Sequence, residues 1–222
     1  MRTRFDQQLE ELHRELIRMG SLCEQAIALS AKLIMQEEGV TAEAVYATDE
    51  QIDRKEQEIE SLCLRLLLQQ QPVARDLRTI SAAMKMISDM ERIGDQAADL
   101  AELAPYLSGT DLPNRVPMGQ MALAAVKMVT DSVEAFVKND LRLAHKVMQE
   151  DDQVDVLFNQ VRQELTELIF RKDTDARAAL DLLMAAKYFE RIGDHAVNIA
   201  EWVEYSITGE HESNEHHPGN ML

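Results

Sequence analysis

Aromatic residues, glycine, proline and cysteine are all scarce in this sequence. Its 222 residues are 5% aromatic and include 8 glycines, 5 prolines and 2 cysteines. Few aromatic and turn-forming residues argue against an all-β fold. Cys23 and Cys63 lack CxxC spacing, so we predict two reduced thiols in the core rather than a disulfide. Hydrophobic residues make up 45% of the chain, which is enough for a packed core and argues against general disorder.

Positive charge is also in short supply. The chain has 23 basic and 40 acidic residues, a net charge of −17. Nucleic acid and anionic lipid are therefore disfavoured as direct partners, whereas cations and basic protein surfaces are favoured. No run reaches the roughly 18 apolar residues of a membrane span, and the first residues lack the apolar region of a signal peptide. We expect a cytoplasmic protein without a transmembrane segment.

Apolar residues recur at spacings of three and four over most of the chain, which predicts six amphipathic helices. Pro72 can begin a helix, and Gly109, Pro113 and Pro117 mark a linker. The expected helices cover about 5–35, 42–70, a third segment that Pro72 can begin and that includes Ile80 to Ala97, then 118–138, 141–171 and a last segment that is capped by Asp173 or Thr174 and ends near Ser206. The tail after it has no apolar period, so we expect disorder there, with solvated histidines.

The chain repeats itself. "ERIGDQAADLAE" at 91–102 returns as "ERIGDHAVNIAE" at 190–201, an offset of 99, and "DEQID" at 49–53 parallels "DDQVD" at 151–155, an offset of 102. The sequence therefore predicts an all-α protein made of two tandem, similar three-helix bundles related by internal pseudo-twofold symmetry. The expected division is a first bundle at 1–108, a linker at 109–117, a second bundle at 118–207 and a disordered tail at 208–222.

The repeated phrase is acidic along one side. An α-helix turns about 100° per residue, so residues four apart lie close together on its surface. One stripe comprises Glu91, Asp95, Asp99 and Glu102, and its twin comprises Glu190, Asp194, Asn198 and Glu201. Each stripe borders the apolar face of its helix. Gly94 and Gly193 point toward that face, where a missing side chain allows another helix to approach closely.

The preceding helix of each half carries a matching acidic pair. Asp49 and Asp53 lie about as far before the first inter-helix turn as Glu91 and Asp95 lie after it, and Asp151 and Asp155 match Glu190 and Asp194 in the same way. Antiparallel helices joined by short turns place such positions at equal heights. We therefore expect D-x-x-x-D to face E-x-x-x-D in both halves.

Two interpretations of these acids differ in chemistry. A solvated charged face is common, but it usually interleaves Glu with Lys, because like charges at i,i+4 cost roughly 0.2–0.5 kcal/mol per pair. Four carboxylates meeting across two helices instead favour a bound cation, and carboxylates suit hard cations or iron. A carboxylate-bridged metalloenzyme is the enzymatic alternative, but no His, Cys or Tyr lies on the stripes to act as acid or base. We interpret His195 as a surface residue.

The doubled "ERIGD" phrase resembles the signature of the PhoU family, accessory regulators of bacterial phosphate uptake. "LHRELIRMG", "QQPVARDLRTISAAMKMISDMERIGDQA" and "DDQVD" extend the resemblance over residues 5–206. The resemblance implies surface metal clusters, which can hold several ions, of Fe, Mn, Mg, Ca or Zn. The positions that match the motifs are Asp49, Asp53, Glu91, Asp95, Asp151, Asp155, Glu190 and Asp194. Asp99 lies one step further along its stripe. Asn198 replaces the acid at the twin position, so equal occupancy of the two halves is not implied.

The resemblance also implies a role and partners. It suggests a non-enzymatic negative regulator that acts between the phosphate ABC transporter, on its cytoplasmic ATPase side, and the phosphate sensor histidine kinase. Any association with the membrane would then be peripheral and through those partners. A homo-oligomer, most simply a dimer, is expected as well.

Overall fold

The computed structural model describes residues 2–70 and 73–210, and these residues form helices and connecting loops without any strand. The six α-helices are α1 (Arg2–Ile34), α2 (Ala42–Gln70), α3 (Ala74–Leu103), α4 (Met118–Lys138), α5 (Leu141–Phe170) and α6 (Ala176–Thr208). Two short 3₁₀ helices, η1 (Ala104–Leu107) and η2 (Leu112–Arg115), lie between α3 and α4. The predicted all-α fold of two similar three-helix bundles is confirmed.

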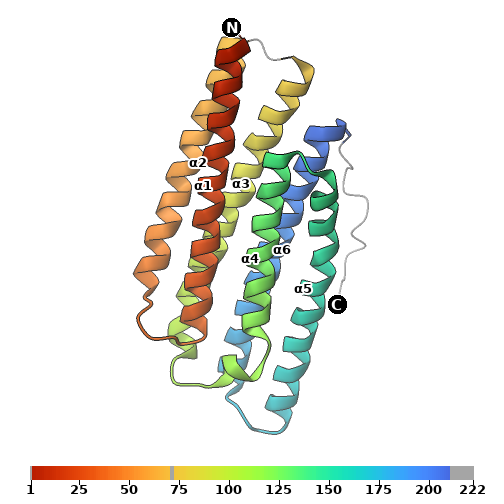
Figure 1. Ribbon diagram of the computed structural model, residues 1–222. Helices are drawn as coiled ribbons and strands as arrows, with labels where there is room; N and C mark the ends of the chain where they lie inside the picture. The colour runs from red at the N-terminus through yellow and green to blue at the C-terminus, as the bar shows by residue number, and fades with distance from the viewer. Residues whose placement is uncertain (1, 71–72, 211–222) are drawn as a thin grey trace.

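The central contact of the molecule joins the two halves. α3 packs against α6, α2 flanks α3, and α5 flanks α6. α1 packs against α2 and α3, α4 packs against α5 and α6, and α1 and α4 also contact each other. α3 and α6 run in opposite directions, and the C-terminal ends of α2 and α5 lie at opposite ends of the molecule (Figure 1). The third helix of each half, which carries the acidic phrase, therefore lies at the centre of the structure.

The buried apolar side chains form one continuous cluster that draws on all six helices. Cys23 and Cys63 lie inside it as free thiols, as predicted, and burial raises the pKa of Cys63 to about 12. The expected linker at 109–117 contains η2, with Leu112 and Val116 buried against this core. The division of the chain into two separable bundles stays a prediction.

Helix ends follow local chemistry. α5 begins after Asp140, whose carboxylate accepts from the backbone N–H of Arg142 at 3.0 Å and of Leu143 at 3.2 Å. α6 begins after Asp175, whose side chain accepts from the Arg177 N–H, so Asp173 and Thr174 are not its N-cap as expected. The expected tail from 208 onward overlaps the last residue of α6, and its part from 211 to 222 lies outside the described residues.

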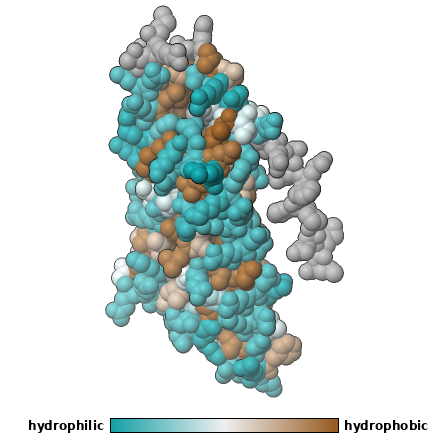
Figure 2. All heavy atoms as spheres, turned by 45° about the vertical axis from the view of Figure 1, so that its right-hand side comes forward, coloured by the Kyte–Doolittle hydropathy of each residue, from teal (hydrophilic) through white to brown (hydrophobic). Residues whose placement is uncertain are grey.

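None of the helices in the described part of the chain is both long and apolar enough to traverse a membrane. Seen from the side of α5 and α6, the surface is mainly hydrophilic, and its hydrophobic atoms lie in separate small patches (Figure 2).

Candidate metal centre

The first acidic cluster joins α2 to α3. Asp49 and Asp53 come from α2, and Glu91, Asp95 and Asp99 come from α3. All five are half-buried. Burial raises the pKa of Asp49 to about 6, and the charges of Asp53, Asp95 and Asp99 raise it further. Burial and then the charge of Asp95 also raise the pKa of Glu91. The acidic pair of α2 therefore faces the stripe of α3, as the equal-height argument predicts.

The second cluster repeats this arrangement between α5 and α6. Asp151 is half-buried, and burial raises its pKa to about 6, followed by the charges of Asp194, Asp155 and Glu190. Burial also raises the pKa of Glu190. The equivalent residues Asp49 and Asp151, and likewise Glu91 and Glu190, thus have pKa values raised by burial in both halves.

A glycine lies beside each cluster and sets how closely the helices approach. A Cβ atom at Gly94 would lie 2.5 Å from Oδ1 of Asp49 and 3.1 Å from Cδ1 of Ile52. At Gly193 the corresponding distances are 3.4 Å to Oδ1 of Asp151 and 3.6 Å to Cγ1 of Val154. Each glycine thus leaves room for the first carboxylate of the facing pair, and the first half is the tighter one.

Each cluster contains a carboxylate oxygen that lacks a hydrogen-bond partner in the described part of the structure. Oδ1 of Asp49 and Oδ1 of Asp151 are buried and have no hydrogen-bond partner in the described part of the structure. A buried, unpaired carboxylate oxygen is costly, so native structures normally satisfy it. The two oxygens occupy equivalent positions, next to Gly94 and Gly193. An all-oxygen donor set of this kind is the one that hard cations and iron prefer.

The protein's own cations balance part of the negative charge. Nη1 of Arg92 lies 2.9 Å from Oδ2 of Asp95, and its Nε lies 3.4 Å from Oε2 of Glu91. In the second half Lys187 pairs with Glu190. Arg92 is well exposed, so its two ion pairs are weak and can be displaced. In the described part of the chain no three Asp, Glu, His or Cys side chains already converge closely enough to hold an ion. Metal binding would therefore need the carboxylates to rotate.

Two of the predicted metal ligands, Asn198 and Asp99, also take part in contacts between the halves. Nδ2 of Asn198 donates to Oδ1 of Asp89 on α3 at 3.0 Å, and Nδ1 of His195 lies 2.9 Å from the same oxygen. The sequence favours a surface position for His195, but its side chain belongs to the α3–α6 contact. On the other side of the pseudo-twofold, the Tyr188 hydroxyl hydrogen-bonds to Asp99. Because position 188 is equivalent to 89 and 198 to 99, the two contacts are symmetry-related.

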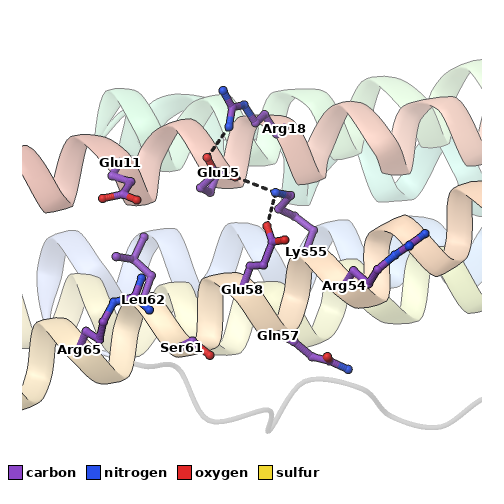
Figure 3. Close-up of a pocket in the computed structure, with 10 residues that line it drawn as sticks. All are labelled: Glu11, Glu15, Arg18, Arg54, Lys55, Gln57, Glu58, Ser61, Leu62 and Arg65. Atoms are coloured by element: carbon purple, nitrogen blue, oxygen red, sulfur yellow. Dashed lines mark hydrogen bonds and ion pairs between the residues drawn. The ribbon is translucent and has the colours of Figure 1, made fainter.

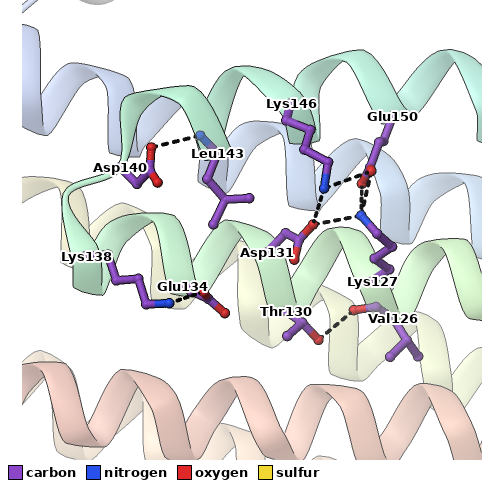
Figure 4. A network of polar contacts seen from close by, with 10 residues as sticks. All are labelled: Val126, Lys127, Thr130, Asp131, Glu134, Lys138, Asp140, Leu143, Lys146 and Glu150. Carbon is purple, nitrogen blue, oxygen red and sulfur yellow. Dashed lines mark hydrogen bonds and ion pairs between the residues drawn. The ribbon is translucent and has the colours of Figure 1, made fainter.

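The charged groove between α1 and α2 is a different feature. Its volume is about 580 Å³, and Lys55 of α2 crosses it to reach Glu15 of α1 at 2.9 Å while also contacting Glu58 on its own helix at 2.5 Å (Figure 3). Hydrogen bonding to Lys55 lowers the pKa of Glu15. In the other half, α4 and α5 are joined by Lys127, which contacts Asp131 and Glu150 (Figure 4). Lys55 and Lys127 are thus each paired with carboxylates of the neighbouring helix, so these contacts tie helices together.

Comparison with known proteins identifies the repeat. The model of the family described as the PhoU domain matches residues 16–104 and again 118–203. The chain belongs to the PhoU family. It is 36% identical over 207 residues to the phosphate-specific transport system accessory protein PhoU homolog of Clostridium acetobutylicum, covering 92% of this chain and 94% of that protein.

Solved PhoU structures share the whole fold. The crystal structure of PhoU from Pseudomonas aeruginosa superposes with a TM-score of 0.83 at 32% identity, covering 93% of this chain and 100% of that one. The phosphate transport system regulatory protein PhoU from Streptococcus pneumoniae gives 0.81 at 26% identity, covering 94% and 99%. Each PhoU domain match spans one acidic cluster, 49–99 in the first and 151–198 in the second.

The titration of the PhoU clusters predicts an unusual pH dependence. Asp49 and Asp151 bind a proton near pH 6 in the folded state but near their ordinary value of 3.8 when unfolded. Between these values the folded state holds more protons, so lowering the pH from 7.5 to 5.5 should stabilise the metal-free protein through these groups.

The measurement is thermal unfolding in a chelator at both pH values. Asp49→Asn/Asp151→Asn should lose this contribution, whereas Asp6→Asn, an exposed acid on α1, should behave like the wild type. A pH dependence that the double variant leaves unchanged would show that these two carboxyls are not the groups that titrate. His13, whose pKa burial lowers, acts in the opposite direction in every variant.

Proposed function

We propose that this protein is a non-enzymatic, cytoplasmic regulator of phosphate uptake whose two acidic clusters bind metal ions. The match to phosphate-specific transport system accessory proteins over more than nine-tenths of the chain is the observation that carries the proposal. The proposed partners are the cytoplasmic ATPase side of the phosphate ABC transporter and the phosphate sensor kinase. The proposed effect is to restrain both when phosphate is plentiful.

The metal part of the proposal follows from the charge balance of the clusters. In the first cluster the five carboxylates outnumber the nearby arginines, which are Arg92, paired with Glu91 and Asp95, and Arg191, whose positive charge acts on Asp99. A divalent or trivalent ion would neutralise this excess charge and tie α2 to α3, and its twin would tie α5 to α6. Asp49 and Asp151 would offer their unpaired Oδ1 atoms. Arg92 and Lys187 would leave their carboxylate partners as the ion binds, which makes metal occupancy a means of changing the charge of this surface.

One residue beside the first cluster could act as an acid or base in the enzymatic alternative, although it does not lie on either acidic stripe. Tyr188 reaches Asp99 from the other half. Burial and the charge of Asp99 raise the pKa of Tyr188 above its ordinary value of 10. The phenol is thus protonated at neutral pH and cannot serve as a base. Tyr188 donates a hydrogen bond instead, which favours a structural role and the regulatory proposal.

A complementation experiment tests the regulatory role. The chain is expressed in a bacterium that lacks its own PhoU-family protein and carries a reporter induced by phosphate starvation. In excess phosphate, the wild-type chain should keep the reporter silent. A variant with the eight motif acids changed to their amides should be present at the same level but leave the reporter on. A reporter that stays on with the wild-type chain, shown to be folded and abundant, would contradict the proposed regulation.

A further inference from the structure

The end of α5 presents an aromatic side chain to solvent. Phe170 is the last residue of α5 and is 83% exposed, next to the partly exposed Ile169. A phenylalanine left in water forfeits the favourable free energy that its burial would provide. Single exposed apolar residues are common on protein surfaces, so the surroundings of Phe170 decide whether it belongs to a binding surface.

The turn that follows Phe170 is firmly held. The backbone N–H of Asp173 donates to the carbonyl of Leu168 at 3.0 Å. From η2, Arg115 donates to the Asp173 carboxylate at 2.9 Å and to its backbone carbonyl at 3.3 Å. The side chain of Asp175 then caps α6. Phe170 is therefore presented by a preorganised turn, which lowers the conformational entropy that binding would cost.

The turn that follows Phe170 and the first turn of α6 carry two exposed cations, Lys172 and Arg177. Lys172 and Arg177 are exposed and form no ion pair within residues 2–70 and 73–210. Two of the acids in this stretch are paired, Glu167 with Arg171 and Asp173 with Arg115, whereas Asp175 caps α6 and keeps its charge. An aromatic anchor beside unpaired cations is complementary to an apolar pocket rimmed by carboxylates.

The other half repeats the exposed apolar residue. Leu68 stands 102 positions before Phe170, the offset that also relates the two acidic pairs, and it too is 83% exposed. Phe170 ends α5 and Leu68 lies in the last turn of α2, and the C-terminal ends of these two helices lie at opposite ends of the molecule (Figure 1). An exposed apolar side chain at the same place in both repeats is difficult to explain as an accident of one helix end.

We propose that Phe170, Lys172 and Arg177 form a docking surface for a partner protein that offers an apolar pocket rimmed by acidic side chains. The inference rests on the proposed function, because it names the surface through which the regulator would contact a partner. An anionic lipid surface fits less well. Two cations would supply only a modest attraction, and a chain with a net charge of −17 would be repelled.

The test uses the purified full-length chain and two probes, the ATPase subunit of the phosphate transporter and the cytoplasmic part of the sensor kinase. The probe that the wild type binds should bind Phe170→Ser roughly thirtyfold or more weakly. Lys172→Glu/Arg177→Glu should slow association and reduce its dependence on salt. Leu123→Ser, which alters a 73% exposed leucine on α4, is the matched control and should bind like the wild type. Circular dichroism establishes that every variant is folded.

Other outcomes would overturn the inference in distinguishable ways. If the wild type binds a probe and all variants bind it equally well, the docking surface is elsewhere and the proposed function stands. If the wild type binds neither probe, both proposals fail. If Phe170→Ser abolishes binding to phosphatidylglycerol vesicles but leaves the probes unaffected, the surface contacts lipid. If it abolishes self-association measured by sedimentation instead, the occupant is a second copy of this chain.

Discussion

Added Mn²⁺, Fe²⁺ or Mg²⁺ is expected to raise the melting temperature of this protein, and Asp95→Asn and Asp194→Asn are each expected to remove about half of that rise. A ligand at a hundred times its dissociation constant stabilises the folded state by about 2.7 kcal/mol per site. For a chain of this length that corresponds to roughly 5–10 °C. Each substitution removes one carboxylate from one cluster, and a hundredfold weaker site would contribute almost nothing at the same metal concentration.

Without metal, the same variants should differ little from the wild type. Asp95→Asn relieves repulsion from neighbouring acids, by up to roughly 0.5 kcal/mol, but also loses the partly exposed ion pair with Arg92, which is worth a similar amount. The double variant should show no metal-dependent shift, and Asp6→Asn should keep the full shift. If wild type and double variant melt alike at every metal concentration, the stripes are solvated faces.

Gly94→Leu is expected to destabilise the protein by about 3 kcal/mol with or without metal, a drop of roughly 10 °C in melting temperature. A first side-chain carbon at this position already meets Asp49 at 2.5 Å, so a whole leucine must push α2 away from α3. Gly119→Leu is the matched control, because a Cβ atom at this other helical glycine meets nothing within 4 Å. It should be neutral or gain up to about 1 kcal/mol of helix propensity.

Alanine substitutions at the two equivalent glycines are expected to have different effects in the two halves. Gly94→Ala should displace the Asp49 carboxylate and so weaken metal binding, whereas Gly193→Ala meets Asp151 at an ordinary contact distance of 3.4 Å and should be tolerated. Equal effects of the two alanines, measured by thermal melting and metal titration, would contradict the closer approach that the structure shows in the first half.

Sequence reasoning succeeded where the controlling physics is local or follows from the repeat. Apolar periodicity located all six helices, and equal sequence distances from each turn predicted that Asp49 would face Asp95. The pairing of α3 with α6 was beyond its reach, because an apolar stripe shows that a helix is buried but not which helix covers it. The contacts of His195 with Asp89 and of Tyr188 with Asp99 depend on that pairing.

The turn at the end of α5 shows a second limit. Asp173 looked like a helix cap from its residue type, but Arg115, 58 positions earlier in the chain, holds it instead. The cap is Asp175. A signal for the cross-half contacts did exist in the repeat: Asp89 and Tyr188 occupy equivalent positions, and so do Asp99 and Asn198. Only the antiparallel register of α3 and α6 brings these pairs together.

Metal analysis of the wild-type chain, purified without a histidine tag, tests the metal-binding role of the acidic clusters most directly. The chain and a variant with the eight motif acids changed to amides are equilibrated with metal, freed of unbound ions and analysed for metal content per chain. We predict about two or more ions per wild-type chain, at least one for each cluster, and essentially none in the folded variant. Equal metal contents in the two proteins would show that the repeated acidic phrase does not hold metal.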